Sequence, residues 1–96
     1  MKRDEIINFL KSNKEFLKEN MGVTSIALFG SYAKGTANEQ SDVDILVELK
    51  EAKHEWMYKL QVYLEQNLNH KIDLVRKGPH LREKFLKSIQ KELAYA

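Results

Sequence analysis

The sequence has no cysteine, a single proline, and no apolar run long enough to cross a bilayer. A secreted domain this short would usually be stabilised by disulfides, so the absence of cysteine favours the cytoplasm. The first residues, MKRDEII, lack the apolar run and small-residue cleavage site of a secretory signal, and we expect no such signal. No repeat, low-complexity stretch or linker interrupts the chain, so we expect one domain over residues 1–96.

The sequence also has no large excess of charge of either sign. The 16 basic and 14 acidic side chains leave a formal net charge of +2, which is too weak to indicate nucleic-acid binding by itself. Residues 76–91 are locally basic, with one acid, Glu83, among Arg76, Lys77, Arg82, Lys84, Lys87 and Lys91. This stretch fits either a solvated helix face or a positive rim that attracts phosphate or an acidic partner. We expect no membrane partner, and no direct nucleic-acid partner, because no aromatic and basic platform for single strands is evident.

Apolar residues recur at helical spacing in three segments. Residues 4–19 are predicted to form one amphipathic helix, with Asn13 as the exception on its apolar stripe and Gly22 as its C-terminal cap. Residues 54–68 are predicted to form a second helix, which carries one apolar side made of Met57, Leu60, Leu64 and Leu68. A last helix is expected to have Pro79 in its first turn and to continue through Leu81, Phe85, Ile89 and Leu93.

Three β-prone runs alternate with these helices: VTSIALF at 23–29, VDILVEL at 43–49 and KIDLVR at 71–76. The first run loses strict alternation at its end, which is typical of a strand buried on both faces. The expected order is helix, strand, short helix, strand, helix, strand, helix. The predicted fold class is therefore α/β (α+β), with a small mixed sheet of three to four strands flanked by helices.

Two aspartates, Asp42 and Asp44, stand two residues apart at the second β-prone run. Residues at this spacing project from the same face of a strand, so the two carboxylates are expected side by side, with Val43 and Ile45 on the other face. Neighbouring carboxylates repel each other, and burial increases this cost unless a cation neutralises them. Mg²⁺ is the natural candidate, because it prefers oxygen ligands and binds one or two carboxylates together with substrate phosphates.

A third carboxylate, Asp73, is embedded in the third β-prone run, where Ile72 and Leu74 face the opposite way. If this strand lies beside the second one, Asp73 can reach the same metal site as Asp42 and Asp44. Two metal ions about 4 Å apart can clamp the attacking and leaving oxygens of an in-line displacement. We therefore predict that these three carboxylates form one metal site.

The first strand runs directly into Gly30-Ser31, and ten residues then separate Ser31 from Asp42. Glycine lets a backbone approach phosphate closely, and free N–H groups together with the Ser31 hydroxyl can bind an anion. Lys34 lies one turn further on and can neutralise phosphate charge. Taken singly, each of these features also fits an ordinary turn, an exposed strand, an Asp73–Lys71 pair or a solvated lysine. Only their combination points to one chemical site.

This combination resembles the DNA polymerase β-like nucleotidyltransferase superfamily, in which a strand, Gly-Ser, a spacer, Asp-x-Asp and a later Asp follow one another. The run GSYAKGTANEQSDVDILV and the chain length resemble its minimal branch, the MNT family, and the resemblance covers about residues 20–96. It implies the nucleotidyltransferase fold, a metal role for Asp42, Asp44 and Asp73, and triphosphate binding by Gly30 and Ser31. Many relatives carry Arg where this chain has Lys34, which keeps the charge without the planar fork.

The resemblance further implies a Mg²⁺-dependent enzyme that transfers AMP from ATP, an MNT antitoxin whose acceptor is a tyrosine of a partner HEPN toxin. After the last expected helix no residues remain for an acceptor-binding domain, so we expect another protein or an open surface to hold the acceptor. Two alternatives stay open: an antitoxin that acts by contact alone, and a transferase that acts on a small molecule or an RNA end. An uncovered apolar helix face would also allow a homo-oligomer.

Overall fold

The computed structural model describes residues 1–96 and contains one four-stranded sheet in the order β3-β2-β1-β4. The inner strands β1 (Val23–Phe29) and β2 (Val43–Leu49) are antiparallel to each other, and β3 (Ile72–Arg76) is parallel to β2. A two-residue strand, β4 (Ala94–Tyr95), lies antiparallel along β1. The predicted mixed sheet flanked by helices is confirmed, whereas β4 was not expected, because two residues carry no readable periodicity.

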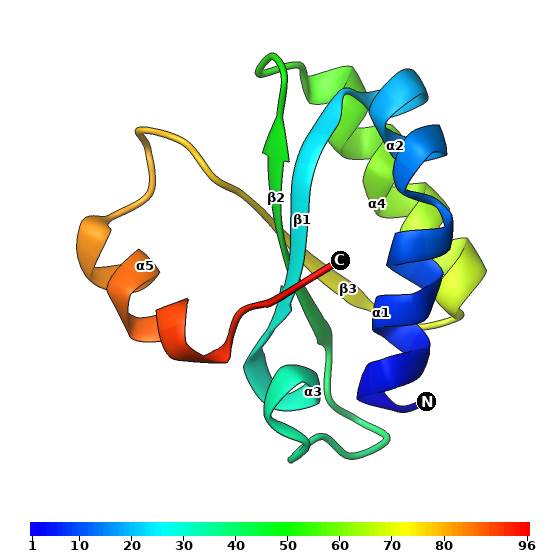
Figure 1. Cartoon of the computed structure of the whole chain (residues 1–96), viewed down its shortest axis with the longest axis vertical. Coiled ribbons are helices and arrows are strands. Elements are labelled where there is room, and N and C mark those ends of the chain that lie inside the picture. Colours follow the sequence, from blue (N-terminus) through cyan, green and yellow to red (C-terminus); the bar gives the residue numbers. More distant parts are fainter.

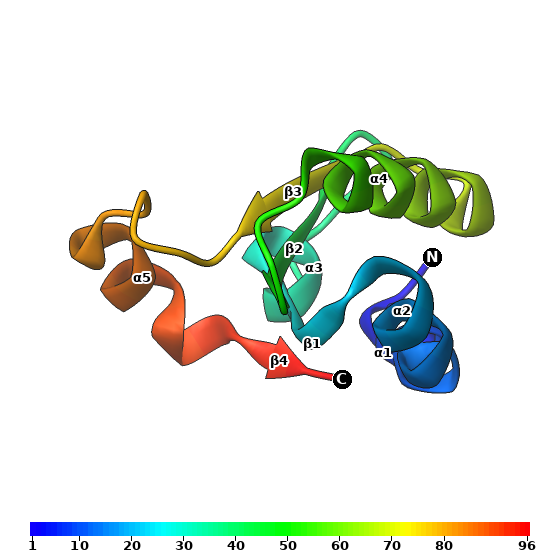
Figure 2. The same cartoon turned by 90° about the horizontal axis from the view of Figure 1, so that it is seen from above.

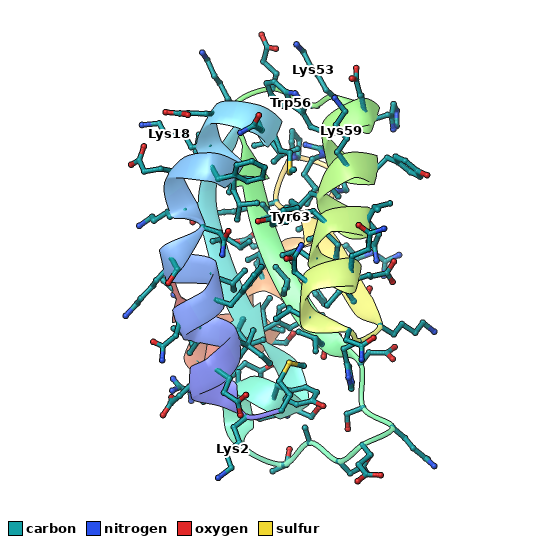
Figure 3. All side chains as sticks on the ribbon, turned by 90° about the vertical axis from the view of Figure 1, so that its right-hand side faces the viewer. Lys2, Lys18, Lys53, Trp56, Lys59 and Tyr63 are labelled. Carbon is teal, nitrogen blue, oxygen red and sulfur yellow. The ribbon has the colours of Figure 1, made fainter.

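Three helices lie on one side of this sheet, as Figure 1 shows: α1 (Arg3–Ser12), α2 (Lys14–Met21) and α4 (His54–Leu68). In Figure 3 the α1–α2 pair and α4 run side by side, with Trp56 and Tyr63 projecting from α4 into the space between them. The ring of Tyr63 stacks on Phe16 at 5.0 Å between centroids, so Phe16 packs on α4 although 43% of it remains exposed.

The helix predicted over residues 4–19 is interrupted at Asn13, and the prediction of one continuous helix is wrong. The Asn13 side chain donates a hydrogen bond to the Phe9 carbonyl at 2.8 Å, in competition with the helix backbone. Its Oδ1 accepts a hydrogen bond from the Tyr63 hydroxyl at 2.7 Å. Asn13 therefore caps the end of α1 and the start of α2, and its hydrogen bond with Tyr63 connects this break to α4. Gly22 ends α2 in the left-handed conformation, as predicted.

The opposite side of the sheet carries α5 (Glu83–Ile89), followed by a 3-10 turn, η1 (Gln90–Glu92), as Figures 1 and 2 show. Pro79 does not lie in the first turn of this helix, and that prediction is wrong. The N–H of Leu81 instead donates to the Gly78 carbonyl at 3.0 Å, which closes a turn with Pro79 at its second position. Proline's fixed φ suits this turn position as well as it suits a helix start.

Two apolar clusters assign the faces of the sheet. The larger one joins the face that carries Val43 and Ile45 to α1, α2 and α4. The smaller one consists of Phe29, Leu46 and Ile89, with Phe85 and Leu86 of α5 packed against it. Because side chains alternate along a strand, Asp44 shares its face with Leu46 and lies on the α5 side of the sheet. None of the helices combines the length and apolar character that a bilayer crossing requires.

Candidate functional site

The predicted carboxylate neighbours lie on adjacent strands. Asp44 of β2 and Asp73 of β3 are direct partners in the register of the parallel pair. The flanking residues Val43, Ile45 and Ile72 belong to the larger apolar cluster, so the two carboxylates project from the opposite face. The prediction that Asp73 can approach Asp44 rested on the two strands being adjacent, and the structure meets this condition.

Asp42 stands just before β2, where its side chain is 43% exposed. The N–H of Val43 donates to the Lys71 carbonyl at 3.0 Å and so holds the starts of β2 and β3 together. The Lys71 ammonium lies 4.0 Å from Oδ2 of Asp42, so Lys71 pairs with Asp42 and not with Asp73. This lysine partly offsets the negative charge of Asp42, whereas Asp73 is exposed and has no such partner.

The electrostatic cost of this arrangement falls on Asp44. Partial burial, the adjacent charge and hydrogen bond of Asp73, and the charges of Asp42 and Glu92 raise the pKa of Asp44 to about 6 from 3.8. Four carboxylates therefore lie close together at this end of the sheet. Lys71 pairs with Asp42 and Lys34 with Glu92, whereas Asp44 and Asp73 form no salt bridge. A bound cation would relieve this repulsion.

The residue directly after β1 must be glycine, as the surroundings of Gly30 show. Its φ of 73° is left-handed, and a Cβ at this position would collide with Oδ2 of Asp44. The absence of a side chain thus lets the backbone of Gly30 lie directly against the carboxylate. The start of α3 (Gly30–Lys34), which follows β1 directly, and the Asp44–Asp73 pair consequently form one site at the lower end of the sheet in Figure 1.

The donor set fits Mg²⁺ in kind, because three carboxylates offer hard oxygen ligands. No three acidic or histidine side chains, however, stand in a finished metal-binding geometry. Mutual repulsion among Asp42, Asp44 and Asp73 opposes such convergence while all three are ionised and no cation is present. Side-chain rotation, with the strands fixed, is the adjustment that metal binding would require.

The other predicted site residues surround Gly30. The Ser31 carbonyl accepts a hydrogen bond from the Thr36 N–H at 2.9 Å, while the Ser31 hydroxyl makes no hydrogen bond within the chain. Lys34 lies 3.6 Å from Oε2 of Glu92, and Oε1 of Glu92 accepts a hydrogen bond from the Gly30 N–H at 2.9 Å. Sequence reasoning missed Glu92, because no local pattern connects it with a turn 62 residues earlier.

His70 is the second residue that sequence reasoning left without a role. Its Nε2 lies 2.6 Å from the Ser41 carbonyl and 3.2 Å from the Tyr32 hydroxyl. These contacts join the spacer (residues 32–41) to the start of β3. His70 thereby holds the residue before Asp42 in place, and nothing in the sequence around it indicates this.

With this geometry in place, comparisons with known proteins decide the family. Residues 6–95 match the nucleotidyltransferase domain family. The chain belongs to that family. A protein of Methanocaldococcus jannaschii, named as a candidate protein adenylyltransferase, is 44% identical over 92 residues, covering 95% of this chain and 94% of that protein. The protein adenylyltransferase MntA of Thermococcus cleftensis is 40% identical over 93 residues, covering 96% of this chain and 93% of that one.

Solved structures agree on the nucleotidyltransferase fold. A structure described as a candidate minimal nucleotidyltransferase matches with a TM-score of 0.73 and 26% identity, covering 92% of this chain and 93% of that chain. A structure described as tri-AMPylated Shewanella oneidensis HEPN toxin in complex with MNT antitoxin matches with a TM-score of 0.63 and 19% identity, covering 92% and 69%. The chain is a nucleotidyltransferase of the minimal, MNT, branch.

Proposed function

We propose that this nucleotidyltransferase transfers AMP from ATP, with Mg²⁺, to the hydroxyl group of a tyrosine on a partner HEPN toxin. The observation that carries the proposal is the in-register pair Asp44 and Asp73, set directly against the backbone of Gly30. This arrangement joins oxygen ligands for a cation to a close approach for phosphate. The naming of relatives as protein adenylyltransferases supports AMP as the transferred group.

In this proposal Asp42, Asp44 and Asp73 would hold Mg²⁺, which supplies charge neutralisation for the triphosphate when it is bound. The Gly30 N–H, the unpaired Ser31 hydroxyl and the Lys34 ammonium would bind the β- and γ-phosphates. These groups fix the α-phosphorus opposite the acceptor, and such positioning is the main contribution that a protein makes to this chemistry.

Asp73 is the carboxylate best placed to meet the acceptor, because its side chain is exposed whereas that of Asp44 is partly buried. It would orient the acceptor hydroxyl and take its proton. The acceptor oxygen then forms a bond to the α-phosphorus as the bond from that phosphorus to the bridging oxygen of the β-phosphate breaks. Pyrophosphate leaves, and AMP remains on the acceptor through a phosphodiester bond.

A protein acceptor suits an exposed site. Asp73 faces solvent on the α5 side of the sheet, where a hydroxyl carried by a macromolecule can reach it. The solved complex of an AMPylated HEPN toxin with an MNT antitoxin supports a HEPN toxin as the partner. The basic residues 76–91 give the same side of the molecule an excess of positive charge, which favours an acidic partner surface.

The test is mass spectrometry of a HEPN toxin incubated with ATP, Mg²⁺ and this chain, either native or as Asp42→Asn/Asp44→Asn. We expect one or more AMP additions with the native chain and none with the double variant. Asp4→Asn is the matched control, because Asp4 is an exposed aspartate of α1 whose carboxylate forms an ion pair with Arg3, away from the site. Peptide mapping then identifies the modified side chain.

Three other outcomes would replace this proposal. No mass gain, with the toxin neutralised equally by the native chain and the double variant, would leave an antitoxin that acts by contact alone. AMP on serine or threonine would keep the enzyme and change the acceptor. Transfer only to a small molecule or an RNA end would remove the toxin from the reaction.

A further inference from the structure

Glu92 reaches the candidate site from the far end of the chain and occupies its anion-binding groups. Its Oε1 accepts the hydrogen bond of the Gly30 N–H at 2.9 Å, and its Oε2 lies 3.6 Å from the Lys34 ammonium. Both oxygens of one carboxylate are thus engaged by the two donors. Only 17% of the Glu92 side chain is exposed, whereas 54% of Lys34 is.

The position of Glu92 is set by the strand that follows it. Ala94 pairs with Leu28 and Tyr95 with Ala27, and the Ala96 N–H donates to the Ile26 carbonyl at 3.1 Å. This short pairing lays η1 across the end of β1. Ile89 and Leu93 pack against the smaller apolar cluster on either side of η1, so the Glu92 side chain, rather than the whole segment, is the part that can move away from Gly30.

The Gly30 N–H and the Lys34 ammonium are the same groups that the proposed function assigns to the nucleotide phosphates. A single N–H points at one acceptor at a time, and a carboxylate beside a phosphate oxygen brings two negative charges together. We propose that Glu92 is a built-in competitor of the nucleoside triphosphate, which takes the place of phosphate in the nucleotide-free protein and so sets nucleotide affinity. This inference rests on the proposed function and adds regulation to the same site.

Two consequences separate competition from a purely structural role. Competition means that removing the charge of Glu92 strengthens nucleotide binding, because the donors no longer need to be freed. A role limited to holding the turn in shape predicts the opposite, because a loosened turn binds phosphate less well. The sign of the change in affinity therefore decides between them.

The experiment measures ATP affinity with Mg²⁺ by titration calorimetry for the native chain, Glu92→Gln and Glu83→Gln. Glu92→Gln keeps the size and the acceptor oxygen but removes the charge, and we expect its Kd to fall about tenfold, the scale of one charge-assisted hydrogen bond. Glu83→Gln is the matched control, because Glu83 lies at the start of α5, is exposed and forms its ion pair with Lys87. Its Kd should equal that of the native chain.

A second readout begins with the native chain, whose response to ATP does not depend on whether a variant folds. Labelling with [¹⁵N]glycine gives four amide signals, from Gly22, Gly30, Gly35 and Gly78. Saturating ATP should move the Gly30 signal strongly, because its acceptor changes from carboxylate to phosphate. Glu92→Gln alone should move the same signal and leave that of Gly22, which packs on Trp56, in place.

A Kd for Glu92→Gln equal to or higher than the native value overturns the inference while nucleotide binding stands. A Gly30 signal that does not respond to saturating ATP in the native chain also overturns it. The absence of ATP binding in all three chains removes the proposed function, and with it the competition.

Discussion

Asp44 and Asp73 are register partners on the parallel strands β2 and β3, and the backbone of Gly30 lies against the first of them. Parallel register makes the proximity of these two residues a property of the sheet, because their backbones cannot separate without loss of strand pairing, although the side chains can rotate. Asp44 and Asp73 therefore share an electrostatic cost, and both are cation ligands in the proposed function.

The first prediction concerns the stability of the metal-free protein. The pKa of Asp44 is raised to about 6, so the folded state favours its protonated form. The free energy of unfolding is therefore highest, as far as Asp44 is concerned, below about pH 4, and it falls as the pH rises through 6 and Asp44 ionises. Asp44→Asn removes the repulsion, and at pH 8 we expect a gain of about 1 kcal/mol, or roughly 4–8 °C in Tm. Thermal unfolding in EDTA at pH 4 and pH 8 measures this gain, and an equal shift at both pH values would contradict the assignment.

The second prediction concerns the cation. Mg²⁺ at 100 times its Kd stabilises the folded state by about 2.7 kcal/mol if it binds only that state. We expect Mg²⁺ to raise the Tm of the native chain and of Asp4→Asn at pH 8, but not that of Asp44→Asn. Sodium chloride at matched ionic strength controls for general screening. A rise in Tm that is equal in all three chains would mean that the ion binds elsewhere.

The third prediction separates steric contact from backbone strain at two glycines. Gly30 and Gly35 have nearly the same left-handed φ, 73° and 76°, but an added Cβ meets Asp44 only at Gly30 and meets nothing within 4 Å at Gly35. Gly35→Ala should cost about 1–2 kcal/mol from strain and keep most of the transfer activity. Gly30→Ala should displace Asp44 and abolish transfer. Activity assays and urea unfolding of both variants test this, and equal losses of activity would contradict the steric role.

The fourth prediction concerns His70, whose ring joins Ser41 to Tyr32. His70→Ala leaves the Tyr32 hydroxyl and the Ser41 carbonyl without this partner, at a cost of about 1–3 kcal/mol. We expect a slower transfer rate at saturating ATP, because Asp42 follows directly after the loosened residue. His54→Ala is the control, since His54 is exposed at the start of α4. An unchanged rate with a lower Tm would limit His70 to a structural role.

Elements in which apolar residues recur at a regular spacing could be predicted from the sequence. The strands 23–29 and 43–49 and the helix 54–68 match the structure in their bounds, because each presents several residues to one apolar cluster. The proximity of Asp44 to Asp73 also followed from strand alternation once the two strands were adjacent.

Features that depend on one long-range contact could not be predicted. The break at Asn13 is fixed by the Tyr63 hydroxyl, which lies 50 residues away in the chain. The role of Glu92 depends on a two-residue strand that brings it to Gly30, and two residues are too few to produce a pattern. The prediction that Pro79 lies in the first turn of a helix failed for another reason, because proline fits a turn and a helix start equally well.

The joint at Asn13 divides one mechanical element into two. An unbroken helix over residues 4–19 would be a straight rod of about 24 Å, and any shift at one end would be passed to the other. In the interrupted form, α1 reaches the turn beside the site, where the Arg3 Nε–H donates to the Ala33 carbonyl at 3.1 Å, while α2 packs against α4. The anchoring of that turn and the fit of the helical layer can therefore vary independently, so the surface away from the site can diverge while the site keeps its shape.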